Sequence, residues 1–169
     1  MEDYLLANPW LIVVIGVMGW SVVLSLIARL SGWSLLAEYY EAADAYDGPR
    51  RRFQSISMER LKFVPSNYGG VVEFGADARG LHISLFILFR PFHPPLVIPW
   101  SDLKVETRQV LMWTQAVLIA ARAPEVKIMV PGPTAQWIAM QSGGVFAFES
   151  EPRPVAADMV KNSVKSQKA

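Results

Sequence analysis

The stretch Pro9–Ala28, PWLIVVIGVMGWSVVLSLIA, decides how the rest of the chain is interpreted, because it contains 20 residues without a formal charge. As a helix it would be about 30 Å long, which matches the hydrocarbon core of a bilayer. Backbone amides inside lipid need hydrogen-bond partners within the segment itself. We therefore predict a membrane-spanning helix over residues 9–28, within an N-terminal region of residues 1–30.

This helix is predicted to be a retained anchor, because a cleaved signal peptide begins with basic residues and has a shorter apolar core. Here the acidic residues Glu2 and Asp3 come first, and Lys or Arg occurs only after the span, at Arg29 and then at Arg50–Arg52. Positive charge favours the cytoplasmic side. The chain is predicted to be single-pass, with its N-terminus outside and its C-terminal domain in the cytoplasm.

Composition restricts the classes of function. The chain has 169 residues, a formal net charge of +1 and no cysteine. The balanced charge argues against a nucleic-acid binder, and the missing cysteines exclude disulfides and thiolate chemistry. Outside the span there is room for one domain of about 100 residues.

Two features of the span suggest contacts within the membrane. Trp10 lies where an aromatic side chain anchors a helix at the headgroup level. Small residues let helices approach closely, so those of the span offer a packing seam against another membrane helix; the alternative is that they are ordinary constituents of such helices. These residues are Gly16, Gly19, Ser21 and Ser25.

A second, shorter helix is predicted over residues 31–43. Trp33, Leu36, Ala37 and Tyr40 recur at helical spacing and form one apolar stripe. Directly after a span, such a helix is predicted to lie along the membrane interface, with Trp33 and Tyr40 as anchors. The alternative is that the stripe docks on the following domain. The residues 47–49, Asp-Gly-Pro, then end the linker region 31–49.

Residues 50–145 show the alternation of strands. In the clearest example, Leu103, Val105 and Thr107 alternate with charged residues. Six or seven short antiparallel strands are predicted, arranged as a small barrel or sandwich, with turns that include residues 65–70. The uncharged run Val110–Ala121 is interpreted as the end of one strand and the start of the next. A helix over residues 133–142 closes the domain, and residues 146–169 are predicted to be a polar, flexible tail.

Strands followed by one C-terminal helix are the layout of the pleckstrin-homology-like (PH-like) fold. The segment Leu96–Leu103, LVIPWSDL, resembles the mid-domain strand of bacterial PH-like and GRAM-like domains. Residues 10–140 resemble uncharacterised bacterial single-pass membrane proteins. The resemblance is carried by Ser31-Gly32-Trp33, Leu36-Ala37, Tyr40, Gly80-Leu81, Leu88-Phe89-Arg90, His93–Leu96 and Ile98–Ser101.

This resemblance implies a PH-like module tethered to the bacterial inner membrane. PH-like domains bind lipid headgroups, peptides or other proteins. The first strands of this chain lack the Lys-x-Lys/Arg pattern of the members that bind phosphoinositides.

No catalytic, cofactor-binding or metal-binding motif is present in the sequence, so an enzyme is not expected. His82 and His93 are the only histidines, and we expect ordinary surface or turn positions for both. A metal site would need both of them with a carboxylate such as Glu73 or Asp102.

Two surfaces stand out instead. Arg50, Arg51 and Arg52 are predicted to contact anionic lipid or an acidic partner. Phe89 and Phe92 belong to an apolar loop that is predicted to contact a protein or a membrane if it is exposed, or to pack in the core if it is not.

We therefore expect a non-enzymatic accessory or scaffold subunit of a larger membrane complex, for example a respiratory or photosynthetic one. Its partners would be other membrane subunits and lipids, with no nucleic acid, cofactor or evident small-molecule substrate. The alternatives are a membrane-organising module that binds anionic headgroups through Arg50–Arg52 and the interfacial helix, or an enzyme with a site at His82 or His93.

Overall fold

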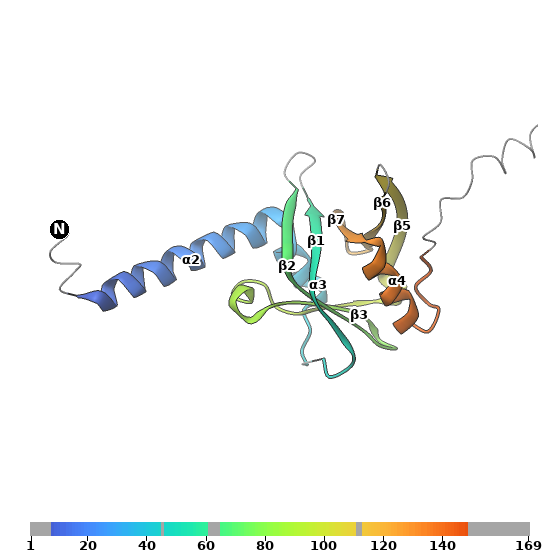
Figure 1. Cartoon of the computed structure of the whole chain (residues 1–169), viewed down its shortest axis with the longest axis horizontal. Helices are drawn as coiled ribbons and strands as arrows, with labels where there is room; N and C mark the ends of the chain where they lie inside the picture. The colour runs from blue at the N-terminus through green and yellow to red at the C-terminus, as the bar shows by residue number, and fades with distance from the viewer. Residues whose placement is uncertain (1–7, 45, 61–64, 111–112, 149–169) are drawn as a thin grey trace, which may run out of the picture.

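The computed structural model describes residues 8–44, 46–60, 65–110 and 113–148. A long N-terminal helix leads into a curled antiparallel sheet, and a short C-terminal helix packs against that sheet (Figure 1). The helices are α2 (Pro9–Ser31), α3 (Trp33–Tyr40) and α4 (Gly132–Gln141), with the short 3-10 turns η1 (Ile87–Phe89) and η2 (Trp100–Asp102). The strands are β1 (Arg50–Glu59), β2 (Ser66–Ala76), β3 (Gly80–Leu85), β4 (Leu96–Pro99), β5 (Leu103–Val110), β6 (Trp113–Ala120) and β7 (Ala123–Pro131).

Helix α2 is a candidate membrane span by its length and composition. Its N-terminal half projects away from the domain (Figure 1), and only 11% of its most apolar window is buried. Proline in the first turn suits the start of a helix because its missing N–H would be unpaired there in any case.

The seven strands form one sheet in the order β4-β3-β2-β1-β7-β6-β5. Strand β1 is central: it pairs with β2 over most of its length and with β7 only through Ser57–Glu59. The sheet curls, but its edge strands β4 and β5 do not pair with each other. It is therefore an open half-barrel. The predicted antiparallel strands, the division of Val110–Ala121 between two strands and the C-terminal helix are confirmed.

One predicted turn is wrong. Residues 66–70 begin strand β2, and its first part pairs with Ile56, Ser57 and Met58 of β1. The glycines at 69 and 70 suggested a turn, but cross-strand pairing and the burial of the preceding Tyr68 outweigh local turn propensity.

The core lies inside the curl of the sheet and is capped by helices. Phe74, Ile83, Leu118 and Ile128 are almost completely buried strand residues, and Ile138 packs onto them from α4. Phe146, at the start of the predicted tail, is also buried and lies 6.1 Å from the ring of Trp100. Residues 149–169 of that tail lie outside the described residues.

The apolar stripe of helix α3 faces the domain core. Trp33, Leu36 and Tyr40 are buried in the domain core, so the prediction of Trp33 and Tyr40 as interfacial anchors is wrong and the alternative of docking on the domain holds. The Tyr40 hydroxyl donates to Oδ2 of Asp102 at 3.2 Å and accepts from the backbone N–H of Arg122 at 3.1 Å. Burial in the domain gives the Tyr40 ring apolar surroundings and its hydroxyl hydrogen-bond partners.

Candidate functional site

The most constrained part of the molecule is the junction between α2 and the domain. Gly32 separates the two helices with a left-handed φ of 90°. A Cβ atom there would lie 2.6 Å from Cγ2 of Val126, a fully buried residue of β7. Glycine is therefore required both by the backbone conformation and by the space available.

A buried chain of hydrogen bonds crosses this junction. The Ser31 hydroxyl lies 2.8 Å from the Tyr68 hydroxyl, which lies 3.1 Å from Nε2 of His93, while Nδ1 of His93 lies 3.1 Å from the carbonyl of Pro91. Because a carbonyl only accepts, Nδ1 carries the proton and Nε2 accepts from Tyr68. Ser31 then donates to Tyr68. The chain ties the last residue of α2 to β2 and to the loop before β4.

Burial sets the protonation states of this chain. Desolvation lowers the pKa of His93 despite its bond to the Pro91 carbonyl, which acts in the opposite direction. Desolvation raises the pKa of Tyr68 to about 12, although its bond with Ser31 acts to lower it. Both groups are therefore neutral at pH 7. The donor and acceptor roles assigned above require this state.

Further contacts fix α2 against the domain. Leu24 and Ala28 are buried on the side of the helix that faces the sheet. A guanidinium N–H of Arg60 donates to the carbonyl of Arg29 at 2.9 Å and so satisfies a carbonyl of the last helical turn. A cation at a helix C-terminus also interacts favourably with the helix dipole.

The apolar loop between β3 and β4 meets α2 farther along the helix. The indole N–H of Trp20 donates to the carbonyl of Leu88 at 3.3 Å, and its ring lies 5.6 Å from the ring of Phe89. Phe89 is half-buried by this contact and packs against the core, whereas Phe92 is exposed. Of the two alternatives predicted for the loop, packing in the core therefore holds for Phe89 and exposure holds for Phe92.

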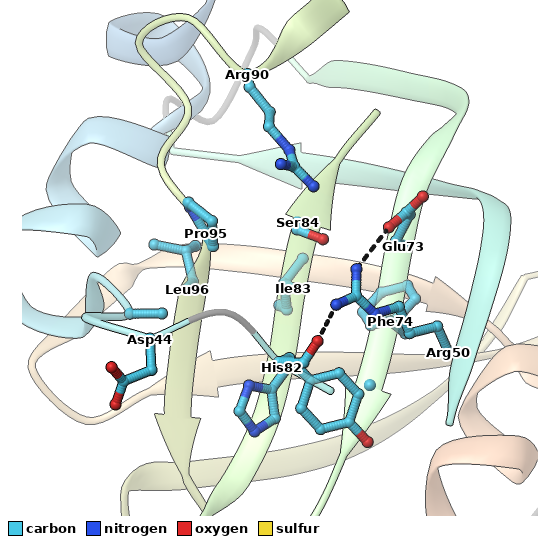
Figure 2. Close-up of a pocket in the computed structure, with 13 residues that line it drawn as sticks. Asp44, Arg50, Glu73, Phe74, His82, Ile83, Ser84, Arg90, Pro95 and Leu96 are labelled. Atoms are coloured by element: carbon cyan, nitrogen blue, oxygen red, sulfur yellow. Dashed lines mark hydrogen bonds and ion pairs between the residues drawn. The ribbon is translucent and has the colours of Figure 1, made fainter. Parts of the chain in front are cut away.

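A small pocket of about 70 Å³ opens beside strands β2 and β3 (Figure 2). Its charged and polar lining includes Arg50, Glu73, Ser84 and Arg90. Figure 2 shows the Arg90 side chain running from the loop toward Ser84, while Arg50 meets Glu73. The pocket is far smaller than the cavities of roughly 300–1,000 Å³ that hold cofactors and other organic ligands.

His82 lies at one end of this pocket and is buried, so the expected surface position is wrong for it. His93 lies in the turn expected for it, and it is buried there. Nε2 of His82 lies 3.0 Å from Oδ2 of Asp77, and the ring of Tyr46 covers the His82 ring at 4.1 Å. Partial burial acts to raise the pKa of Asp77, but the interactions with His82 and with the backbone of Arg79 outweigh it and lower the pKa. The Asp77–His82 pair joins the β2–β3 turn to β3, and the Tyr46 ring packs the segment before β1 onto His82.

Of the three arginines predicted to contact anionic lipid or an acidic partner, two share one carboxylate and the third lies apart. Arg50 and Arg52 each lie 3.6 Å from a carboxylate oxygen of Glu73. Arg51 instead donates to the carbonyl of Pro133 at the start of α4. With Arg90 nearby, Arg50 and Arg52 surround one carboxylate, which leaves a local excess of positive charge.

The small residues of the span do not share one face. Gly16 and Gly19 have no atom within 4 Å of an added Cβ. Ser21 and Ser25 are half-buried toward the domain, and the Ser21 hydroxyl bonds back to the carbonyl of Val17. At about 100° per residue, Ser21 lies about 140° around the helix from Gly16. Trp10, the predicted headgroup anchor, is exposed at the start of α2.

Within the described ranges, no three His, Asp or Glu side chains gather so as to hold a metal ion. His82 pairs with Asp77 and His93 with Tyr68, so neither lies with Glu73 and Asp102 in a common ligand set. Comparisons of the chain with protein-family models, curated proteins and solved structures find no match.

Sequence reasoning missed Trp20, Ser31 and Tyr68 as participants in these contacts. One signal was available: tryptophan is typical of the two ends of a span, and Trp20 lies near its middle. The serine and the tyrosine carried no local signal, because their partners are far away in the sequence.

Proposed function

We propose that the chain is a non-enzymatic, membrane-anchored accessory or scaffold subunit of a larger membrane protein complex. In this proposal α2 spans the bacterial inner membrane with its N-terminus outside, and a PH-like domain covers cytoplasmic surfaces of the partner subunits. The half-barrel with its C-terminal helix is compatible with that fold.

The observation that carries the proposal is the packed junction at Gly32. A simple tether would need no buried hydrogen bonds between the anchor and the domain, yet Ser31, Tyr68 and His93 form such a chain across it. A domain held in one orientation relative to its anchor can present a fixed surface to a neighbouring membrane protein. The free glycine face at Gly16 and Gly19 gives the partner's helix a place for close approach.

The test is blue-native electrophoresis of gently solubilised native membranes, followed by identification of the proteins that co-purify. We expect a band well above the size of the monomer. A band at monomer size alone would overturn the proposal.

Two variants that place a leucine on nearly opposite sides of α2 sharpen this test. Gly16→Leu fills the free glycine face, and we expect it to shift the large band toward the monomer. Val14→Leu adds volume about 200° around the same helix and should leave the band in place. Equal behaviour of the two variants would exclude the glycine face as the contact.

A second candidate function, a membrane-organising module, is favoured by one observation: arginines and exposed apolar side chains adjoin at the β3–β4 loop. The interfacial helix no longer supports this candidate, because its aromatic stripe is buried in the domain. Flotation of the full chain with neutral or anionic vesicles tests it, and no preference for anionic lipid would remove it.

A further inference from the structure

The contact between Trp20 and the β3–β4 loop limits the length of α2 that is free to cross a bilayer. Trp20 is the twelfth of the 23 residues of α2, so the part of the described helix that stands clear of the domain runs from Pro9 to Gly19. This part is only about 17 Å long, whereas the hydrocarbon core of a bilayer is about 30 Å thick. Tilting the helix shortens its reach across the bilayer further. For α2 to cross, the loop beside Trp20 has to lie below the membrane surface.

The side chains of this loop are suited to that position. Leu88 is 64% exposed and Ile87 is 66% exposed, and Phe53 of β1 extends the apolar surface because its ring lies 6.4 Å from that of Phe86. With Phe92 these residues make up what we call the loop patch: Phe53, Phe86, Ile87, Leu88 and Phe92. Figure 1 shows the loop on the side of the domain from which α2 leaves.

Backbone strain is concentrated in the same patch. In the ranges that the structure describes, Phe53 (φ 56°) and Phe92 (φ 63°) are the two residues other than glycine with a positive φ. A bulky side chain in the left-handed region is strained and marks a position that the surroundings impose. At Phe53 the strain coincides with a register shift in β1, between Arg51 and Gln54. The result in both cases is an exposed phenylalanine ring.

The polar backbone of the loop is largely satisfied from within the protein. The Phe86 N–H donates to the carbonyl of Val71, and the N–H groups of Phe89 and Arg90 donate within the 3-10 turn. Carbonyls are also occupied: Leu88 accepts from the Trp20 indole, and Leu85 accepts from Nε of Arg90. Irregular backbone is tolerated at membrane depth only where it is buried in protein. These internal bonds tie the backbone of the loop to the protein, and its apolar side chains are the part that faces lipid.

Arginines border the patch. Figure 2 shows the Arg90 side chain turning back from the loop toward Ser84. Arg52, which lies 3.6 Å from Glu73, directly precedes Phe53. Long basic side chains next to an apolar surface commonly extend away from hydrocarbon toward the phosphates of the headgroups. An apolar surface flanked by arginines suits a bilayer, whose hydrocarbon would meet the apolar side chains and whose phosphates would meet the arginines. It suits the surface of a soluble partner protein less well.

We infer that the loop patch inserts into the hydrocarbon of the lipid leaflet on the domain's side, beside α2. The domain is then partly embedded next to its own anchor, and Arg52 and Arg90 lie at the headgroup level. This inference rests on the part of the proposed function in which α2 spans a membrane, and it goes beyond that part because the domain itself enters the bilayer. Partner subunits are not required.

Depth-dependent fluorescence quenching tests the inference on the full chain. The sequence contains no cysteine, so a single introduced cysteine carries the only thiol-linked fluorophore. The probe positions are Leu88→Cys and Phe92→Cys in the patch, and Val17→Cys in the middle of α2. Met140→Cys is the matched control, because Met140 is 74% exposed on α4, outside the patch. Each variant is reconstituted into vesicles of phosphatidylglycerol and acyl-brominated phosphatidylcholine.

We expect the bromolipid to quench the Leu88 and Phe92 probes several-fold, as it quenches the Val17 probe, and to leave the Met140 probe nearly unchanged. Quenching at Val17 without quenching at Leu88 and Phe92 would overturn the inference and leave a protein partner as the occupant of the patch. Absence of quenching at Val17 would overturn the membrane span, and with it both this inference and the proposed function.

Discussion

At the scale of single residues, Gly32 is the position that the junction tolerates least. We expect Gly32→Ala to lower the free energy of unfolding by at least about 2 kcal/mol. The left-handed backbone costs a residue with a Cβ about 1–2 kcal/mol, and overpacking a core costs about 1–3 kcal/mol. The stiff, fully buried Val126 that the new methyl group would meet has little room to move.

The measurement is thermal unfolding of the full chain in mild detergent, followed by near-ultraviolet circular dichroism. Gly69→Ala is the matched control, because its Cβ would meet no atom within 4 Å. We expect that control to stay within about 0.5 kcal/mol of the original chain. Equal losses in the two variants would show that the junction is not specially constrained.

His93 is expected to make stability depend on pH. Its pKa is below the ordinary value in the folded protein, so between the two pKa values the unfolded chain binds more protons. The free energy of unfolding therefore falls as the pH drops below about 6.5 and stops falling below the folded pKa. A buried imidazolium would also lose its acceptor role toward Tyr68.

Urea titrations of the full chain in detergent between pH 7.5 and pH 5 measure this slope. We expect His93→Gln to be less stable at pH 7.5 but to have a flatter profile, since glutamine does not titrate. His82→Gln serves as the comparison and should keep the contribution of His93. An unchanged slope in His93→Gln would contradict the prediction.

At the scale of elements, the Tyr40 hydroxyl adds to the docking of α3 that the buried aromatic stripe provides. Tyr40→Phe keeps the packing of the ring but leaves the Arg122 N–H and the Asp102 carboxylate without this partner. We expect it to lower the free energy of unfolding by about 1–2 kcal/mol. Tyr39→Phe changes an exposed ring on the same helix and should be nearly neutral. The comparison uses the same thermal unfolding measurement, and equal effects would refute the role of the hydroxyl.

The elements differ in how far local sequence determined them. The apolar span, most of the strands and the C-terminal helix followed from hydrophobic periodicity and turn residues, because these patterns reflect burial directly. The stripe of Trp33, Leu36 and Tyr40 was equally clear, but periodicity shows only that one face is buried. Whether lipid or protein covers that face depends on β4 and β7, which come much later in the chain.

The contacts of the candidate site were harder to predict for the same reason. Ser31 and Tyr68 are 37 positions apart, and Trp20 and Leu88 are 68 apart. The apolar and basic character of residues 86–92 and 50–52 was visible in the sequence. Their positions relative to the span were not, since only the curl of the sheet brings the loop beside α2.

At the scale of the whole molecule, α2 is attached to the domain at two levels. One is the junction at Ser31 and Gly32, and the other is the contact of Trp20 with the loop. The two levels are 11 residues apart, or about 16 Å along the helix axis. Attachment at two separated points resists bending in a way that attachment at one end does not, so the helix and the domain should move as one body.

This rigidity predicts a narrow distribution of distances across the junction. Pairs of spin labels on introduced cysteines measure it by pulsed electron resonance, with Thr107 as the shared position. The pair Val17–Thr107 crosses the junction, and the pair Asn67–Thr107 lies within the sheet. We expect the two distributions to have similar widths in lipid vesicles, and Trp20→Ala to broaden the first while sparing the second. A Val17–Thr107 distribution that is already several times broader in the original sequence would mean that α2 is a flexible tether, and the fixed orientation on which the scaffold proposal depends would be lost.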